Sequence, residues 1–205
     1  MEVKIFVEGI ADKKFIKDFI SQKYNVQLGK NDIIETEGWT NIFSDGSDGE
    51  KVRNKMTQNT DDDGTNLLIF DANNNFRVRL NEIEEWRQET NLDFEIFLWP
   101  NHSDSGDLET VLESIINPKN SPIFDCWDSY ETCLRSKSIE GRTNPLTTPA
   151  KKTKIYGYLE ALLGETRSQK EKIKERKRNY KKTEFWNLDS DYLNPLKFFL
   201  DKHLL

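Results

Sequence analysis

The chain has 205 residues, of which 35% are hydrophobic and 32% charged, and its formal net charge is −6 at pH 7. No apolar run approaches the roughly 20 residues of a membrane span, the N-terminus lacks the features of a secretory signal, and two cysteines are too few for a disulfide framework. We therefore expect no membrane partner and a cytoplasmic location, and the acidic average taken alone argues against a nucleic-acid partner.

The first sixty residues predict strands and helices in alternation. Residues 3–7 (VKIFV) are typical of a buried strand, and residues 12–24 carry apolar side chains at helical spacing. Residues 32–36 predict a short second strand. A loop rich in Gly, Ser and Asp is expected over residues 38–48, followed by a short helix over residues 49–56.

The next sixty residues repeat this alternation. Residues 60–64 (TDDDG) predict a turn, and residues 66–70 (NLLIF) predict a strand. An amphipathic helix is expected over residues 77–89, before a strand at residues 94–99 (FEIFLW) and a helix over residues 107–116.

The rest of the chain is predicted to be largely helical. Helices are expected over residues 122–134 and 151–163, with a loop at residues 141–149 between them. Residues 168–182 predict a charged, exposed helix, and residues 193–205 carry apolar side chains at the spacing of a helix that docks on the body.

Strands that alternate with helices of about 10–15 residues predict β-α-β units. We therefore expect an α/β, Rossmann-like fold with a mostly parallel central sheet over residues 1–118. Residues 119–205 are expected to form a helical extension packed on the same domain.

The charge is unevenly distributed along the chain. The net charge is −13 over residues 1–140, +9 over residues 142–182 and −2 over residues 183–205. A basic segment beside an acidic body predicts either a surface that faces a polyanion or a solvated helix that pairs with the body. If the partner is nucleic acid, the candidates to contact its backbone are Lys151, Lys152, Lys170, Arg176 and Arg178.

Acidic residues follow three of the predicted strands. Glu8 follows the first strand with Asp12 in the next helical turn, Asp71 ends the third strand, and Glu109 opens the helix after the fourth. Parallel sheets bind ligands at the carboxyl ends of their strands, and Mg²⁺ prefers oxygen ligands with one or two carboxylates. These acids predict a divalent-metal site, with Asn73 as a neutral oxygen ligand; alternatively they only cap helices and turns.

These motifs carry a resemblance to a known superfamily. VEGIADKKFI resembles the opening motif of the topoisomerase–primase (Toprim) domain, and IFDANNN resembles its Asp-x-Asp motif after the third strand. With FLWPN…SGDLETVL, KTKIYGYLEALL and W…LNPLKFFL, the chain resembles small stand-alone microbial Toprim-related proteins of unassigned function. These look related to the Toprim nuclease domain of the overcoming-lysogenisation-defect (OLD) family.

The resemblance implies roles for particular residues. Glu8 matches the Toprim glutamate, a general acid/base or metal ligand, while Asp12, Asp71 and Glu109 match further acids of an OLD-type Mg²⁺ or Mn²⁺ site. It also implies a basic residue after the acidic motifs, for which we favour Lys154 over Lys151 and Lys152. His102 lies close to the predicted site in sequence and is a secondary candidate for a base.

The resemblance implies metal-dependent phosphodiester chemistry on DNA or RNA, most simply a nuclease. One departure favours an alternative: the second Asp of the pair is Asn73, which carries no charge, so the chain is alternatively a non-catalytic module that binds nucleic acid or nucleotide. The Gly-x-x-x-x-Gly-Lys-Ser/Thr phosphate-binding loop of ATPases does not occur in the sequence, so an ATPase partner would be a separate protein.

Overall fold

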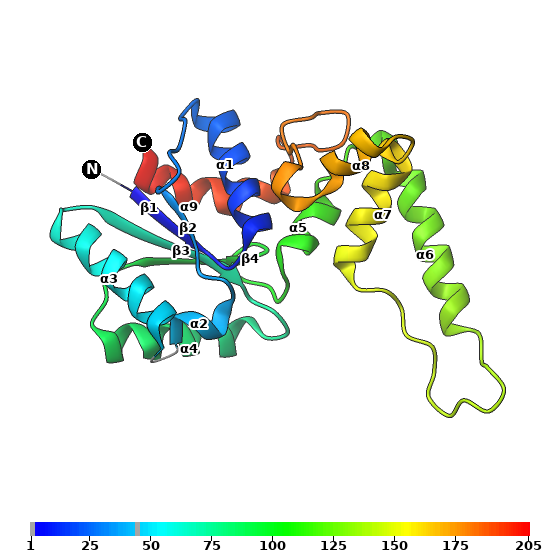
Figure 1. The fold of residues 1–205 in the computed structure, drawn as a ribbon, viewed down its shortest axis with the longest axis horizontal. Coiled ribbons are helices and arrows are strands. Elements are labelled where there is room, and N and C mark those ends of the chain that lie inside the picture. Colours follow the sequence, from blue (N-terminus) through cyan, green and yellow to red (C-terminus); the bar gives the residue numbers. More distant parts are fainter. Residues whose placement is uncertain (1–2, 44–45) are drawn as a thin grey trace.

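A computed structural model describes residues 3–43 and 46–205 (Figure 1). Within these residues, one sheet has four parallel strands in the order β2-β1-β3-β4. The strands are β1 (Val3–Val7), β2 (Ile33–Glu35), β3 (Thr65–Asp71) and β4 (Glu95–Trp99). The predicted α/β, Rossmann-like fold with a parallel central sheet is confirmed.

Helices cover both faces of the sheet (Figure 1). The helices of this part are α1 (Ile10–Tyr24), α2 (Trp39–Phe43), α3 (Ser47–Asp61), α4 (Phe76–Thr90) and α5 (Leu108–Ser114). Because side chains alternate along a strand, Ile5 and Val7 pack in one core with α1, whereas Phe6 packs in the other with α2, α3 and α4. The sheet is therefore buried on both sides.

The C-terminal part shares the core of the sheet. Its helices are α6 (Ser121–Arg135), α7 (Lys151–Leu163), α8 (Arg167–Ile173) and α9 (Asn194–Leu204), with 3-10 turns at Pro118–Asn120, Glu175–Lys177 and Asp191–Leu193. Tyr158 of α7 and Leu200 of α9 are fully buried in the same cluster as Ile5. In Figure 1, α6 and the long connection to α7 extend to one side of the body.

Two of the sequence predictions for local structure are wrong. The loop expected over residues 38–48 contains α2 and the start of α3, although residues 44 and 45 lie outside the described part. The exposed helix expected over residues 168–182 ends at Ile173, because Ile173 and Tyr180 are buried and the chain between them turns to reach the core. Tyr180 N donates to Asp18 Oδ2 of α1 at 2.9 Å, which anchors this segment to the body.

Within residues 3–43 and 46–205, no helix is both long and apolar enough to cross a membrane.

Buried Asn66 ties the start of β3 to its neighbours. Its side-chain amide nitrogen lies 3.0 Å from Met56 O, Thr60 Oγ1 and Asp93 O, and its Oδ1 accepts from Asn59 Nδ2. Asn66→Ala removes these hydrogen bonds, including the buried ones to Asn59 Nδ2 and Met56 O, so we expect it to lower the free energy of unfolding by about 2–3 kcal/mol. Urea denaturation measures this change, with exposed Asn31→Ala as the control; equal midpoints for the two variants would refute the assignment.

Candidate functional site

A pocket of about 310 Å³ lies at the carboxyl edge of the sheet. Glu8 follows β1, Asp71 ends β3, Asp12 stands in the first turn of α1, and Glu109 stands in the first turn of α5. The four acids predicted from sequence therefore meet at one place. The pocket is lined by Glu8, Gly9, Ile10, Ala11, Asp12, Asp71, Leu108, Glu109, Lys152 and Glu175.

Asp12 is held by groups from two elements. Helix α1 begins after Gly9, whose backbone N–H donates to Asp12 Oδ2 at 3.2 Å. From the end of β4, Trp99 Nε1 donates to Asp12 Oδ1 at 3.0 Å. Asp12 therefore caps the start of α1, which is the alternative role that the sequence offered. It is also a buried carboxyl group in the pocket.

Backbone amides hold Glu8 and Asp71. Asp71 N donates to Glu8 Oε1 at 3.0 Å, and Leu108 N donates to Asp71 Oδ1 at 3.1 Å. Leu108 is the first residue of α5, whose N-cap is Asp107, so its amide has no partner within the helix and is free to bind the Asp71 carboxyl group. The topology of the sheet and the start of α5 together bring these acids to the pocket.

The acids in the pocket raise one another's pKa values. Burial, followed by repulsion from Asp12, Glu8 and Glu109, raises the pKa of Asp71 from 3.8 to about 9. Burial and repulsion from Glu8 and Glu109 raise the pKa of Asp12 to about 7, and burial also raises the pKa of Glu109. Burial and mutual repulsion therefore disfavour the charged forms of these carboxyl groups when no cation is present.

Two basic side chains act on this site: Lys152, which the sequence offered as a candidate but ranked below Lys154, and Arg79, which sequence reasoning did not consider. Lys152 lines the pocket and its Nζ lies 2.5 Å from Glu175 Oε1, which raises the pKa of the lysine. Arg79 is buried in α4; burial lowers its pKa, and attraction to Glu8 and Asp71 opposes this shift. Arg79 lies in the first turn of the helix that follows β3. This position, close to the carboxyl end of a strand, was the feature of the sequence that could have indicated a role at the site.

The donor set of the pocket suits a hard divalent cation. Its four carboxyl groups supply the oxygen ligands that Mg²⁺ and Mn²⁺ prefer. The raised pKa values of Asp12, Asp71 and Glu109 show that their charged forms lack a compensating partner, which a cation would supply. In the arrangement that the structure gives to residues 3–43 and 46–205, no group of three or more His, Cys, Asp or Glu side chains is already placed to hold a metal ion. Cation binding therefore requires these side chains to reorient within the pocket.

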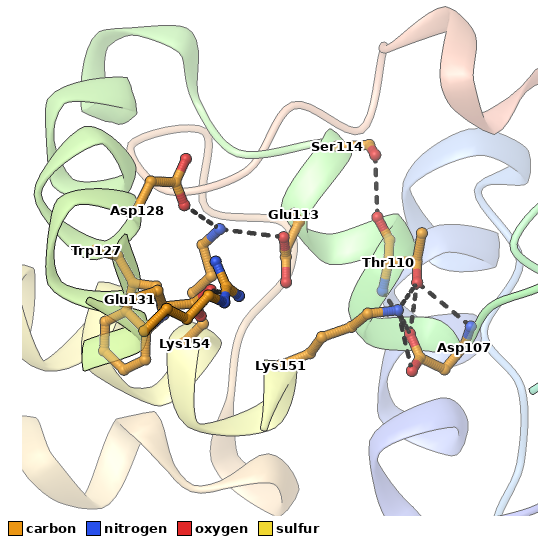
Figure 2. Close-up of polar contacts among 10 residues, drawn as sticks. Asp107, Thr110, Glu113, Ser114, Trp127, Asp128, Glu131, Lys151 and Lys154 are labelled. Carbon is orange, nitrogen blue, oxygen red and sulfur yellow. Dashed lines mark hydrogen bonds and ion pairs between the residues drawn. The ribbon is translucent and has the colours of Figure 1, made fainter. Parts of the chain in front are cut away.

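Asn73 and Lys154 do not line this pocket. Asn73 is exposed and left-handed (φ 53°), a conformation that asparagine tolerates, and its N–H donates to Gly106 O at 2.7 Å. Lys154 Nζ lies 2.9 Å from Asp128 Oδ1 and 3.4 Å from Glu113 Oε2 (Figure 2). Lys152 occupies the place at the pocket that the sequence interpretation gave to Lys154.

His102 does not line the acidic pocket, and it contacts the end of β4. Leu98 N donates to its Nδ1 at 3.1 Å, and its ring stacks on Phe97 at 5.7 Å between centroids. Burial, together with repulsion from Lys202, lowers the pKa of the imidazole.

The basic segment of residues 142–182 pairs extensively with acids. Lys151 Nζ lies 3.2 Å from Asp107 Oδ1 (Figure 2), and Lys170 Nζ lies 3.2 Å from Glu160 Oε1. Arg176 instead lines an open basic groove beside β2. Arg178 is only 3% exposed, so it does not lie on the exposed face of the basic segment, and its role in contacting nucleic acid stays a prediction.

The family comparison matches residues 2–204 to the family described as "Protein of unknown function (DUF3226)". The chain belongs to this family. No curated protein and no solved structure matches the chain. Because the family description names no activity, the function has to be inferred from the site.

The raised pKa values of Asp12 and Asp71 make the stability of the metal-free protein depend on pH. Above about pH 4 the folded chain retains protons that the unfolded chain releases, so the free energy of unfolding falls as the pH rises through about 7 and about 9. In EDTA we expect the thermal midpoint to fall between about pH 5 and about pH 8, and to fall less in Asp71→Asn, which cannot ionise.

Exposed Asp125→Asn is the matched control, since it removes an equal charge away from the pocket. Wild type and Asp71→Asn curves that run parallel across this pH range would show that the carboxyl groups do not repel one another in the folded chain.

Proposed function

We propose that this protein carries out divalent-metal-dependent phosphodiester chemistry on nucleic acid, as a nuclease of the kind that the Toprim and OLD-type resemblance implies. The observation that carries the proposal is the meeting of Glu8, Asp12, Asp71 and Glu109 in one pocket, where the pKa values of Asp12, Asp71 and Glu109 are raised. Acids packed without enough cations repel a phosphate until a metal ion arrives, so the site favours a metal-dependent reaction.

The four carboxyl groups would hold Mg²⁺ or Mn²⁺. When bound, such an ion lowers the pKa of a water molecule and neutralises charge on a phosphate. Glu8 is the residue we propose as general acid or base, because its carboxyl group lines the pocket and its Oε1 is oriented by Asp71 N.

We propose that Lys152 acts on the phosphate and that Arg79 positions the acids. Lys152 lines the pocket and is half-exposed, so its ammonium group can exchange the Glu175 carboxylate for a phosphate oxygen. Arg79 is buried beside Glu8 and Asp71 and stabilises the position of these acids. Lys152 therefore binds substrate, whereas Arg79 positions the acids.

Location and partners belong to the same proposal. Cys126 and Cys133 are both free and exposed, which suits the reducing cytoplasm. An ATPase partner would be a separate protein that supplies the phosphate-binding loop absent from this sequence.

A second candidate function is a binding module for nucleic acid or nucleotide without catalysis. The neutral, exposed Asn73 at the position of the second Asp of the Toprim pair favours it, because one negative charge of the resembling motif is missing. This alternative predicts that the chain binds a polyanion without cleaving it and binds Mn²⁺ weakly.

A cleavage assay distinguishes the two candidates. Single- and double-stranded DNA and RNA are incubated with the purified chain in Mn²⁺, and with the Glu8→Gln/Asp71→Asn double variant as the control. We expect cleavage by wild type that falls at least about 100-fold in the double variant, since both acids act on the metal and water. Equal activity of the two proteins would exclude the nuclease.

Lys152 and Lys154 provide a matched pair of variants on one helix. We expect Lys152→Ala to lower kcat/KM about 10- to 100-fold, because a cation in contact with the phosphate stabilises developing charge. Lys154→Ala removes the ion pairs with Glu113 and Asp128 instead, and we expect the assay to show near wild-type cleavage. The reverse order of effects would restore Lys154 as the functional lysine.

A further inference from the structure

A second pocket, of about 480 Å³, lies between α7, α8 and the chain of residues 177–186. It shares none of its lining residues with the acidic pocket. Its volume lies in the range of small-molecule sites. Its lining combines apolar and aromatic side chains, among them Leu159 and Trp186, with basic ones, among them Lys172 and Arg178.

Arg178 is a buried cation without a buried anion. It is 3% exposed, its Nε donates to Ile173 O and its Nη1 to Tyr180 Oη, both at 3.2 Å, and its guanidinium lies 5.1 Å from the Tyr156 ring centre. All of these partners are neutral. Its Nη2 is buried without a hydrogen bond, and no carboxylate among the described residues forms an ion pair with it.

Such a guanidinium is costly to bury unless an anion compensates it. Arginine stays protonated in proteins, and a buried charge is ordinarily paired. Stacking on Tyr156 offsets part of the cost but satisfies no N–H group. The free Nη2 donor and the missing counter-charge therefore both point to an anionic ligand.

Lysines surround the same pocket. Lys172, Lys177 and Lys182 line it against a single lining acid, Glu184, within the part of the chain that the structure describes. Lys177 pairs with Glu171 and Lys182 with Glu184 on the exposed surface, where ion pairs contribute little and exchange readily. Lys172 has no ion pair among the described residues, so it can meet an anion without breaking one.

The remaining lining is apolar and aromatic. Leu159 and Trp186 are buried, and Leu163 and Phe185 are partly buried beside them. The indole Nε1 of Trp186 also lacks a hydrogen-bond partner, but Trp186 borders a neighbouring cavity too, so we assign only the Arg178 donor to the ligand. A ligand that fits this lining joins an anionic group to a flat apolar one.

We propose that this pocket binds a nucleotide, with its phosphate at Arg178 and the lysines and its base against the apolar side chains. Arginine forks match phosphate oxygens, and aromatic side chains stack on any base. A free nucleotide and the phosphorylated end of a strand present the same chemistry. The site does not depend on catalysis in the acidic pocket.

Titration calorimetry in EDTA tests the site on the full chain. The probes are inorganic phosphate, AMP, and one short oligonucleotide with and without a 5′-phosphate. We expect wild type to bind AMP or the phosphorylated oligonucleotide. Binding should weaken at least about tenfold in Arg178→Met and about tenfold in Lys172→Ala/Lys182→Ala, since charge-assisted contacts are lost. AMP binding identifies a free nucleotide, and binding of the phosphorylated oligonucleotide alone identifies a strand end.

Lys170→Ala/Lys174→Ala is the matched control, since both lysines are exposed and lie outside the pocket lining. Arg178→Met changes a buried residue and could fail to fold. In that case the Lys172→Ala/Lys182→Ala variant, which changes only exposed residues, decides the test. No binding of AMP or of the phosphorylated oligonucleotide at millimolar concentration, or equal weakening in the control, would overturn the proposal. Loss of nuclease activity in the acidic pocket would leave it standing.

Discussion

Repulsion among carboxyl groups at the carboxyl edge of the sheet is the constraint on which the proposed chemistry depends. The parallel strands β1 and β3 end side by side, so the acids that follow them must share one pocket. Backbone amides of Gly9, Asp71 and Leu108 and the indole of Trp99 hold them there. These neutral donors orient the carboxyl groups but do not cancel their charge, which leaves that task to a cation.

The residues that sequence reasoning placed correctly are those whose position follows from topology. Glu8 and Asp71 are carried by apolar strands, and the parallel order of those strands puts their ends together. The choice of lysine depended on a finer feature, because two residues along a helix are about 200° apart around its axis. Only the packing of α7 on the body shows that Lys152 lines the pocket and Lys154 meets Asp128.

The segment after α8 could not be predicted for a related reason. Its many charges favoured an exposed helix, but Ile173 and Tyr180 are buried and pull the chain inward, which carries Arg178 with them. Tyr180 Oη accepts a hydrogen bond from Arg178 Nη1 at 3.2 Å. Burial raises its pKa to about 12, Arg178 opposes the shift, and Asp12 contributes to it. The net charge of −6 therefore conceals an acidic pocket and a separate basic one.

Calorimetric titration with Mn²⁺ near pH 7, in two buffers of different ionisation enthalpy, tests the central claim most directly. Because Asp71 holds a proton at this pH and Asp12 is partly protonated, we predict that Mn²⁺ binds and displaces at least about one proton. Both the binding and the proton release should disappear in Glu8→Gln/Asp71→Asn. Absence of Mn²⁺ binding to wild type, or binding without proton release that persists in the double variant, would contradict a shared carboxylate site.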